Sequence, residues 1–223
     1  MFKILKVMAR VKIEKNTIPY DLGLMYKAFH LKVVKNPSLL TDWLAGQFEL
    51  DEWEMKQAKE LYDETSEDAG YWNEEELKVK FVGLIFRLAN ISTKDKIKVF
   101  YERPLASQVN GYDLAVISDC FVATPLPFNE FDTPLFFLQE FKKKRGEKKD
   151  PEAQMLMAML IAQEKNKDNK PLYGGYLFGS IWNFTLLNGK EYSNSRQYDT
   201  TKWEDLLQII FILRKLKELI LNR

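Results

Sequence analysis

The sequence predicts an α/β protein in which helices pack on a mixed β-sheet. From residue 73 onward the expected order is helix, three strands, helix, strands, helix, which is typical of a sheet covered by helices. Two local signals support this order. Asn110-Gly111 between two apolar runs predicts a hairpin, and Asp150-Pro151 predicts the start of a helix. Residues 1–70 carry mainly helical patterns and are expected to form an N-terminal appendage to a domain over 71–223.

The domain is expected to begin with a helix over residues 74–89. Asn73 is its predicted cap, acidic residues fill its first turn, and apolar residues recur every three or four positions. Strands are then expected over 96–109 and 112–124, on either side of the hairpin turn. A third strand is expected over 134–142, after a loop that contains several prolines.

The second half of the domain begins with residues 152–166, which are apolar almost all round and therefore predict a buried helix. Residues 171–195 alternate short apolar runs with turn signals, which predicts a meander of three strands. An amphipathic pattern predicts a closing helix from about residue 202 to 221.

Two helices are expected in the appendage. Asn36-Pro37 predicts a helix start, with Asn36 as the cap and Pro37 at the first helical position, and Gly46 predicts its end. A charged amphipathic helix is expected from Asp51 to about Glu64. No residue pattern in 1–70 indicates chemistry, so packing against the rest of the chain is its expected role.

The composition limits the classes of function. Of the 223 residues, 29% are charged and 46% are hydrophobic, and the formal net charge is +1. A charge this close to zero argues against a globally basic binder, so any contact with nucleic acid has to come from a local patch. The single cysteine, Cys120, excludes an internal disulfide and a thiolate metal cluster. Without a signal-peptide core or a membrane-length apolar run, a cytoplasmic location is expected.

One acidic-x-lysine pattern stands out by its context. Five such patterns occur, beginning at Glu54, Glu76, Glu140, Glu147 and Asp168. Only Glu140 lies on a predicted strand, where a period of two residues places Glu140 and Lys142 on one face. In a helix, residues two apart do not share a face. A surface ion pair is one interpretation of Glu140 and Lys142, and an active site is the other.

The preceding strand supplies a second embedded carboxylate. Asp119 follows an apolar run that only Ser118 interrupts. Buried carboxylates are costly unless they are paired, protonated or bound to a metal. Asp119 and Glu140 on neighbouring strands would repel each other, and a divalent cation resolves this repulsion. Oxygen ligands favour Mg²⁺ or Mn²⁺. Asp113 on the same strand face is the alternative to Asp119, but it lies less deep in the apolar run.

Asp119, a proline-containing loop and then Glu140-Phe141-Lys142 resemble the signature of the PD-(D/E)xK, restriction-endonuclease-like nuclease superfamily. The order helix, three strands, helix, strand over roughly residues 73–185 is similar to the common core of that superfamily. The chain also resembles a group of small standalone bacterial proteins within it, most of them without an assigned reaction. One departure is that Ser118, and not proline, precedes Asp119.

The resemblance implies two supporting residues. The superfamily often places an acid on its first helix near the metal, and Glu74 falls nearest the stripe that faces the sheet. Glu76 is a less favoured choice, because it also fits a capping box with Asn73. Gln154, early in the buried helix, corresponds to a glutamine of exonuclease-like branches; support of the helix start is its other interpretation.

The resemblance thus implies hydrolysis of phosphodiester bonds with Mg²⁺ or Mn²⁺. Asp119 and Glu140 would be the metal ligands, with Lys142, Glu74 and Gln154 in the catalytic site. The substrate is expected to be nucleic acid, with DNA favoured. The alternative is a catalytically silent nuclease-like module that serves as a binding or scaffold protein.

The basic run after the third strand is the predicted contact with nucleic acid. It includes Lys143, Lys144 and Arg145, whose positive charge next to such a site would attract a phosphate backbone. A solvated turn is the other interpretation of this run. His30 is the only histidine, which leaves little for a serine- or cysteine-type triad and makes zinc a poor candidate.

Overall fold

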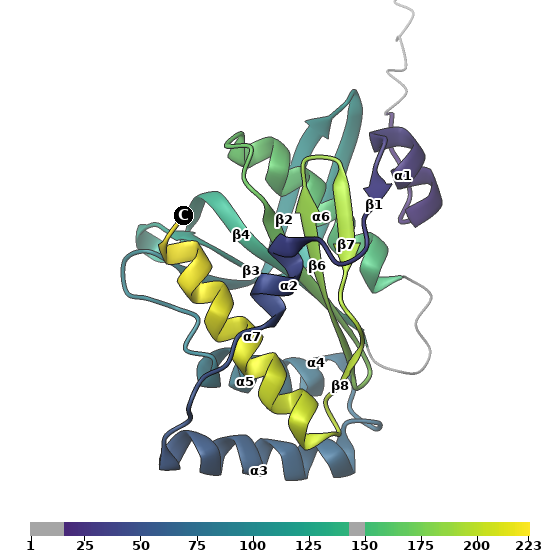
Figure 1. Ribbon diagram of the computed structural model, residues 1–223. Coiled ribbons are helices and arrows are strands. Elements are labelled where there is room, and N and C mark those ends of the chain that lie inside the picture. The colour runs from purple at the N-terminus through teal and green to yellow at the C-terminus, as the bar shows by residue number, and fades with distance from the viewer. Residues whose placement is uncertain (1–15, 143–149) are drawn as a thin grey trace, which may run out of the picture.

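The computed structural model describes residues 16–142 and 150–223. Within them the chain forms an α/β structure whose mixed sheet is flanked by helices, which confirms the predicted class (Figure 1). The eight described strands run in the order β1-β7-β6-β5-β4-β3-β2, and β8 pairs with β6. Neighbours are antiparallel, except for the parallel pairs β4–β5 and β1–β7.

The helical elements are α1 (Leu22–Phe29), α2 (Ser38–Leu44), α3 (Glu52–Asp68), α4 (Glu74–Glu76), a π-helical segment (Leu77–Val82), α5 (Gly83–Leu88), a 3₁₀ turn (Pro127–Asn129), α6 (Pro151–Asn166) and α7 (Trp203–Leu221). The strands are β1 (Lys32–Val33), β2 (Lys98–Val109), β3 (Tyr112–Pro125), β4 (Phe131–Lys142), β5 (Leu172–Phe178), β6 (Ile181–Asn188), β7 (Glu191–Asn194) and β8 (Tyr198–Asp199). Each helix and strand expected after residue 73 is present.

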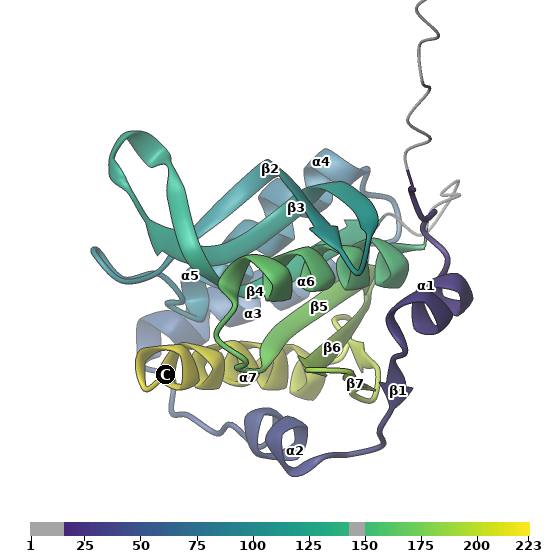
Figure 2. The ribbon, with the colours of Figure 1, turned by 90° about the horizontal axis from the view of Figure 1, so that it is seen from above.

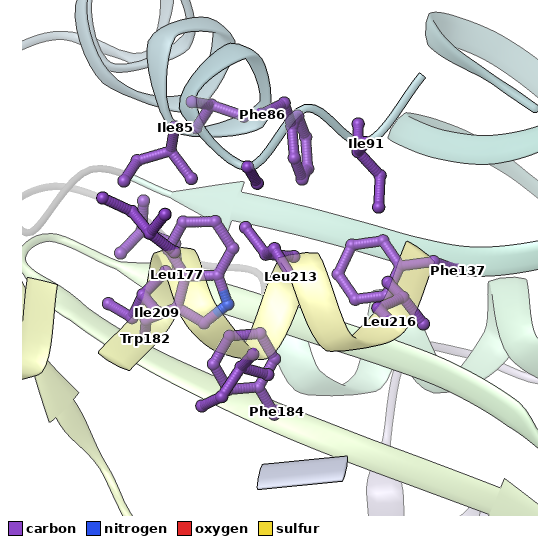
Figure 3. Close-up of a cluster of buried hydrophobic side chains, with 14 of the residues drawn as sticks. Ile85, Phe86, Ile91, Phe137, Leu177, Trp182, Phe184, Ile209, Leu213 and Leu216 are labelled. Carbon is purple, nitrogen blue, oxygen red and sulfur yellow. The ribbon is translucent and has the colours of Figure 1, made fainter. Parts of the chain in front are cut away.

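Helices cover both faces of the sheet. In Figure 1, α7 crosses in front of the strands and α6 lies behind them, and Figure 2 shows the same arrangement from above. One apolar cluster joins the sheet to α2, α3, α5 and α7, and a second joins it to α1 and α6. Figure 3 shows the first cluster, in which Trp182 and Phe184 are fully buried. These two aromatic residues therefore belong to the core.

Local signals explain two boundaries. At the hairpin turn, Asn110 and Gly111 have φ values of 48° and 82°, which match a tight turn that requires two positive φ angles. Asn73 and Glu76 form the predicted capping box, since the side chain of each accepts a hydrogen bond from the backbone N–H of the other. The helix that follows is continuous from α4 to α5, with the π-helical segment between them.

The predicted cap of α2 is wrong. Asn36 has a left-handed φ of 49°, and the extended Pro37 occupies the cap position, with no capping hydrogen bond from a side chain. The carbonyl of Pro37 instead accepts from the N–H groups of Leu40 and Thr41. Proline suits this place because a helix needs no N–H donor there. The charged helix α3 also runs further than expected, to Asp68.

Across residues 16–142 and 150–223, none of the helices combines the length and apolar character that a membrane span requires.

Candidate active site

The site lies where the pairing of β3 with β4 ends. Their last paired residues are Cys120 and Gln139, so Asp119 and Glu140 are the next residues on the two strands. Beyond this point β3 continues beside β2, and β4 continues beside β5 as far as Lys142. The two central strands β3 and β4 therefore stop pairing at the two predicted carboxylates, Asp119 and Glu140.

The two carboxyl groups replace the missing backbone pairing. The N–H of Asp119 donates to Oε1 of Glu140 at 3.2 Å, and the N–H of Phe141 donates to Oδ2 of Asp119 at 2.8 Å. Each side chain therefore accepts a hydrogen bond from a buried backbone N–H group on the opposite strand. Without this partner, the buried N–H group would be unpaired and would destabilise the fold. We call this reciprocal arrangement the carboxyl clasp.

The clasp is buried, and burial changes its acid–base behaviour. Glu140 has no exposed surface and Asp119 retains 5%. Burial, the charge of Asp119 and a hydrogen bond to the Asp119 side chain hold the pKa of Glu140 well above its usual value. Burial also raises the pKa of Asp119, although the charge of Lys142 opposes this. The pair therefore retains a proton at pH values at which an exposed glutamate is ionised.

Lys142 is the cation of the site. Its Nζ lies 3.6 Å from Oδ2 of Asp119 and 3.2 Å from Oε1 of Glu74, and it donates to the carbonyl of Phe141 at 3.1 Å. Burial by itself would lower the pKa of Lys142, but the charges of Asp119, Glu74 and Glu140 outweigh it, so that the pKa is raised. Lys142 is therefore a protonated hydrogen-bond donor and not a base.

The three acids of α4 take different roles. Glu74 reaches Lys142, which places it in the site. Glu75 is exposed and pairs with Lys78 at 3.0 Å, and Glu76 belongs to the capping box. The structure thus brings Glu74, Asp119, Glu140 and Lys142 together, from three elements of the chain.

Gln154 lies in the first half of α6 and is buried, with 6% of its surface exposed. Its Oε1 has no hydrogen-bond partner among the described residues. No hydrogen bond or ion pair within the described residues joins Gln154 to Asp119, Glu140 or Lys142. The predicted burial is therefore present, and the predicted role stays a prediction.

Asp113, the alternative to Asp119, and His30, the only histidine of the sequence, lie outside the site. Asp113 is exposed near the β2–β3 turn, where it accepts a hydrogen bond from Gln108. His30 is exposed at the end of α1. Lys143, Lys144 and Arg145 lie outside the described residues.

Tyr20 is a residue near the site that sequence reasoning missed. The segment before α1 lies beside β3, where the carbonyl of Asn16 accepts from the N–H of Asp113 at 2.9 Å. The Tyr20 hydroxyl donates to the carbonyl of Ala115 at 3.5 Å. Burial and the charge of Glu140 raise the pKa of Tyr20, and the charge of Lys142 opposes them. A residue 95 positions away in sequence from its partner strand gives no local signal.

The two carboxyl groups of the clasp are the residues of this site that could hold a divalent cation. Oε2 of Glu140 is buried and has no hydrogen-bond partner within the described chain, although a carboxylate oxygen in such surroundings normally has one. The described residues include no group of three or more His, Cys, Asp or Glu side chains that could hold a metal ion. Two carboxylates nevertheless suit Mg²⁺, which keeps several waters and takes one or two carboxylates from the protein.

Neither the models of known protein families nor the curated proteins include a match to this chain. The activity of the site therefore has to be inferred from its geometry.

Proposed function

We propose that this protein is a Mg²⁺- or Mn²⁺-dependent nuclease of restriction-endonuclease-like fold, which hydrolyses phosphodiester bonds of nucleic acid, DNA foremost. The observation that carries this proposal is the fully buried Glu140 carboxyl. One of its oxygens is unpartnered within the described residues, its neighbour is the carboxyl group of Asp119, and Lys142 lies 3.6 Å from Asp119. Such a cluster is costly in a protein that makes no use of it.

The architecture supports the proposal. The helix from α4 to α5, the three strands β2 to β4, the buried helix α6 and the strand β5 follow one another in the order of the superfamily core. Asp119 lies on the second of these strands, and Glu140 and Lys142 lie on the third.

The residues have distinct roles in this mechanism. Asp119 and Glu140 would hold the cation, which supplies Lewis-acid activation of the phosphate and of a water molecule when bound. Lys142 stays protonated and donates to phosphate oxygens, where negative charge increases in the transition state. Glu74 positions Lys142 through the contact at 3.2 Å. A water molecule releases a proton to solvent and attacks phosphorus, one P–O ester bond breaks, and the leaving oxygen takes a proton from solvent.

One observation favours the alternative of a catalytically silent binding or scaffold protein. The carboxyl clasp satisfies two backbone donors and retains a proton, so both carboxyl groups have a structural role without a metal. A protein that had lost turnover would keep the clasp for this reason alone.

Metal binding separates the two functions. Mn²⁺ should bind the wild type in calorimetry, and Asp119→Asn should abolish this binding. Single-turnover cleavage of a panel of labelled DNA and RNA in Mg²⁺ and Mn²⁺ then tests the chemistry. Metal binding with cleavage supports the nuclease. Absence of both metal binding and cleavage overturns it in favour of the scaffold.

A further inference from the structure

A basic groove lies between α5 and the beginning of β2. In the strand order, β2 is the edge strand opposite β1. The volume of the groove is about 610 Å³. Arg87, Lys94 and Lys98 line it, and none of the described residues that line it is acidic. The net charge of the whole chain is only +1, so three cations around one groove are a local concentration of positive charge.

The cations of the groove are not neutralised within the described residues. The side chains of Arg87 and Lys94 make no ion pair or hydrogen bond there, and the side chain of Lys98 bonds only to the neutral side-chain amide of Asn129, at 2.8 Å. By contrast, Lys78 and Lys142 are paired with carboxylates. Unpaired cations at a concave surface are suited to bind an anion, because the anion meets no opposing carboxylate.

The groove adjoins the candidate active site. Tyr101 lines one end of it, and the register partner of Tyr101 is Cys120, the residue after Asp119. Lys98 and Tyr101 are three positions apart on β2, a distance of about 10 Å along the strand. Glu102, which follows Tyr101, is paired with Lys78 at 2.7 Å.

Tyr101 adds an aromatic surface to the positive charge. Its side chain keeps 37% of its surface exposed. Cations along a groove together with an exposed aromatic ring are the combination that single-stranded nucleic acid needs, since the cations attract phosphates and the ring stacks on a base.

We propose that this groove binds the sugar–phosphate backbone of a nucleic-acid strand next to the scissile bond, with Arg87, Lys94 and Lys98 as phosphate contacts and Tyr101 as a stacking surface. The inference rests on the proposed function for its substrate class. The groove is a second binding site, which residues of α5, the following loop and β2 form. It is separate from the basic run after β4 that the sequence predicts as the contact with nucleic acid.

The test compares two pairs of substitutions that remove the same positive charge. Arg87→Ala/Lys94→Ala removes two groove cations, and Lys165→Ala/Lys167→Ala removes two exposed cations at the end of α6. Binding of a labelled single-stranded oligonucleotide is measured by fluorescence anisotropy in Ca²⁺ over a series of salt concentrations. Melting curves confirm that both variants fold.

The groove variant should bind at least ten-fold more weakly than the wild type. The slope of log K against log salt should become shallower by about 1.4, because each lost contact with a single strand contributes about 0.7. The α6 variant should bind like the wild type. Equal effects of the two variants, or no binding of the oligonucleotide by the wild type, would overturn the inference.

Two further arms identify the bound species and separate the two proposals. If inorganic phosphate or AMP binds in an Arg87-dependent way while the oligonucleotide does not, the groove holds a small phosphate compound and the proposed strand is wrong. If the groove variant loses binding while the wild type neither binds Mn²⁺ nor cleaves, the groove inference stands and the proposed nuclease activity fails. If the wild type cleaves and both variants bind equally, only the groove inference fails.

Discussion

Replacing Glu140 by Gln tests the acid–base state of the carboxyl clasp. The amide keeps the shape of the side chain, and its oxygen still accepts from the N–H of Asp119. The pKa of Glu140 in the folded protein is raised well above its ordinary 4.5, so the folded state binds a proton that the unfolded state has released. The associated stability is fully present below pH 4.5 and is lost as the pH rises through the raised pKa.

The magnitude follows from this linkage. Within the window above pH 4.5, one extra proton on the folded state makes the free energy of unfolding fall by up to about 1.4 kcal/mol per pH unit. For a chain of this length that corresponds to about 3–5 °C in Tm per pH unit. Metal-free Glu140→Gln lacks this titration, so its Tm should fall less steeply with pH and should exceed the wild-type Tm at the upper end of the window.

The assay is thermal unfolding in a chelating buffer from pH 4 to 8, for the wild type, Glu140→Gln and the control Glu191→Gln. Glu191 is exposed on β7, and its substitution should change stability by less than about 0.5 kcal/mol at each pH. A Glu140→Gln variant that is less stable than the wild type by a constant amount across this range would refute the reasoning. The ionised carboxylate would then be a structural partner.

Three further predictions concern the metal, the cation and the packing. Mn²⁺ at a hundred-fold excess over its Kd should stabilise the wild type by about 2.7 kcal/mol in thermal unfolding, and Asp119→Asn should lose this response. Lys142→Ala should slow single-turnover cleavage by about a hundred- to a thousand-fold, because it removes a donor to charge that forms in the transition state, while oligonucleotide binding in Ca²⁺ persists. Gly46→Ala should destabilise the protein by about 1–3 kcal/mol in urea, since the new Cβ would lie 2.8 Å from the carbonyl oxygen of Phe211 in α7.

The substitutions of Lys142 and Gly46 each have a matched control. Lys167→Ala removes an exposed lysine and should leave cleavage unchanged, and equal losses in Lys142→Ala and Lys167→Ala would contradict a role in the chemistry. A Cβ on Gly70 would meet no atom within 4 Å, so Gly70→Ala should be nearly neutral. Equal stability changes at the two glycines would contradict the close approach of the chain to α7. An Asp119→Asn variant that Mn²⁺ still stabilises fully would exclude Asp119 as a ligand.

Local and periodic features of the fold could be predicted from sequence. The capping box of Asn73 and Glu76 is set by residues three apart, and the turn at Asn110-Gly111 by two adjacent residues, so short windows contain the whole signal. The period of two along β4 was enough to bring Glu140 and Lys142 to one site. The prediction of Asn36 as the cap of α2 was wrong because the proline itself, Pro37, occupies the cap position.

Long-range features were beyond the sequence. The clasp depends on where the pairing of β3 with β4 ends, and no residue type marks that point. Tyr20 reaches the site only because the segment before α1 lies beside β3. The groove between α5 and β2 gathers Arg87, Lys94 and Lys98 through the packing of a helix against an edge strand, whereas the sequence pointed to the basic run after β4.

The carboxyl clasp has one more consequence. Because Oε1 of Glu140 and Oδ2 of Asp119 accept from the N–H groups of Asp119 and Phe141, a cation held by these carboxyl groups would draw electron density from both hydrogen bonds and weaken them. Occupancy of the proposed site would therefore speed the hydrogen exchange of these two amides. Their exchange with heavy water would then report metal binding from within the protein, without a substrate.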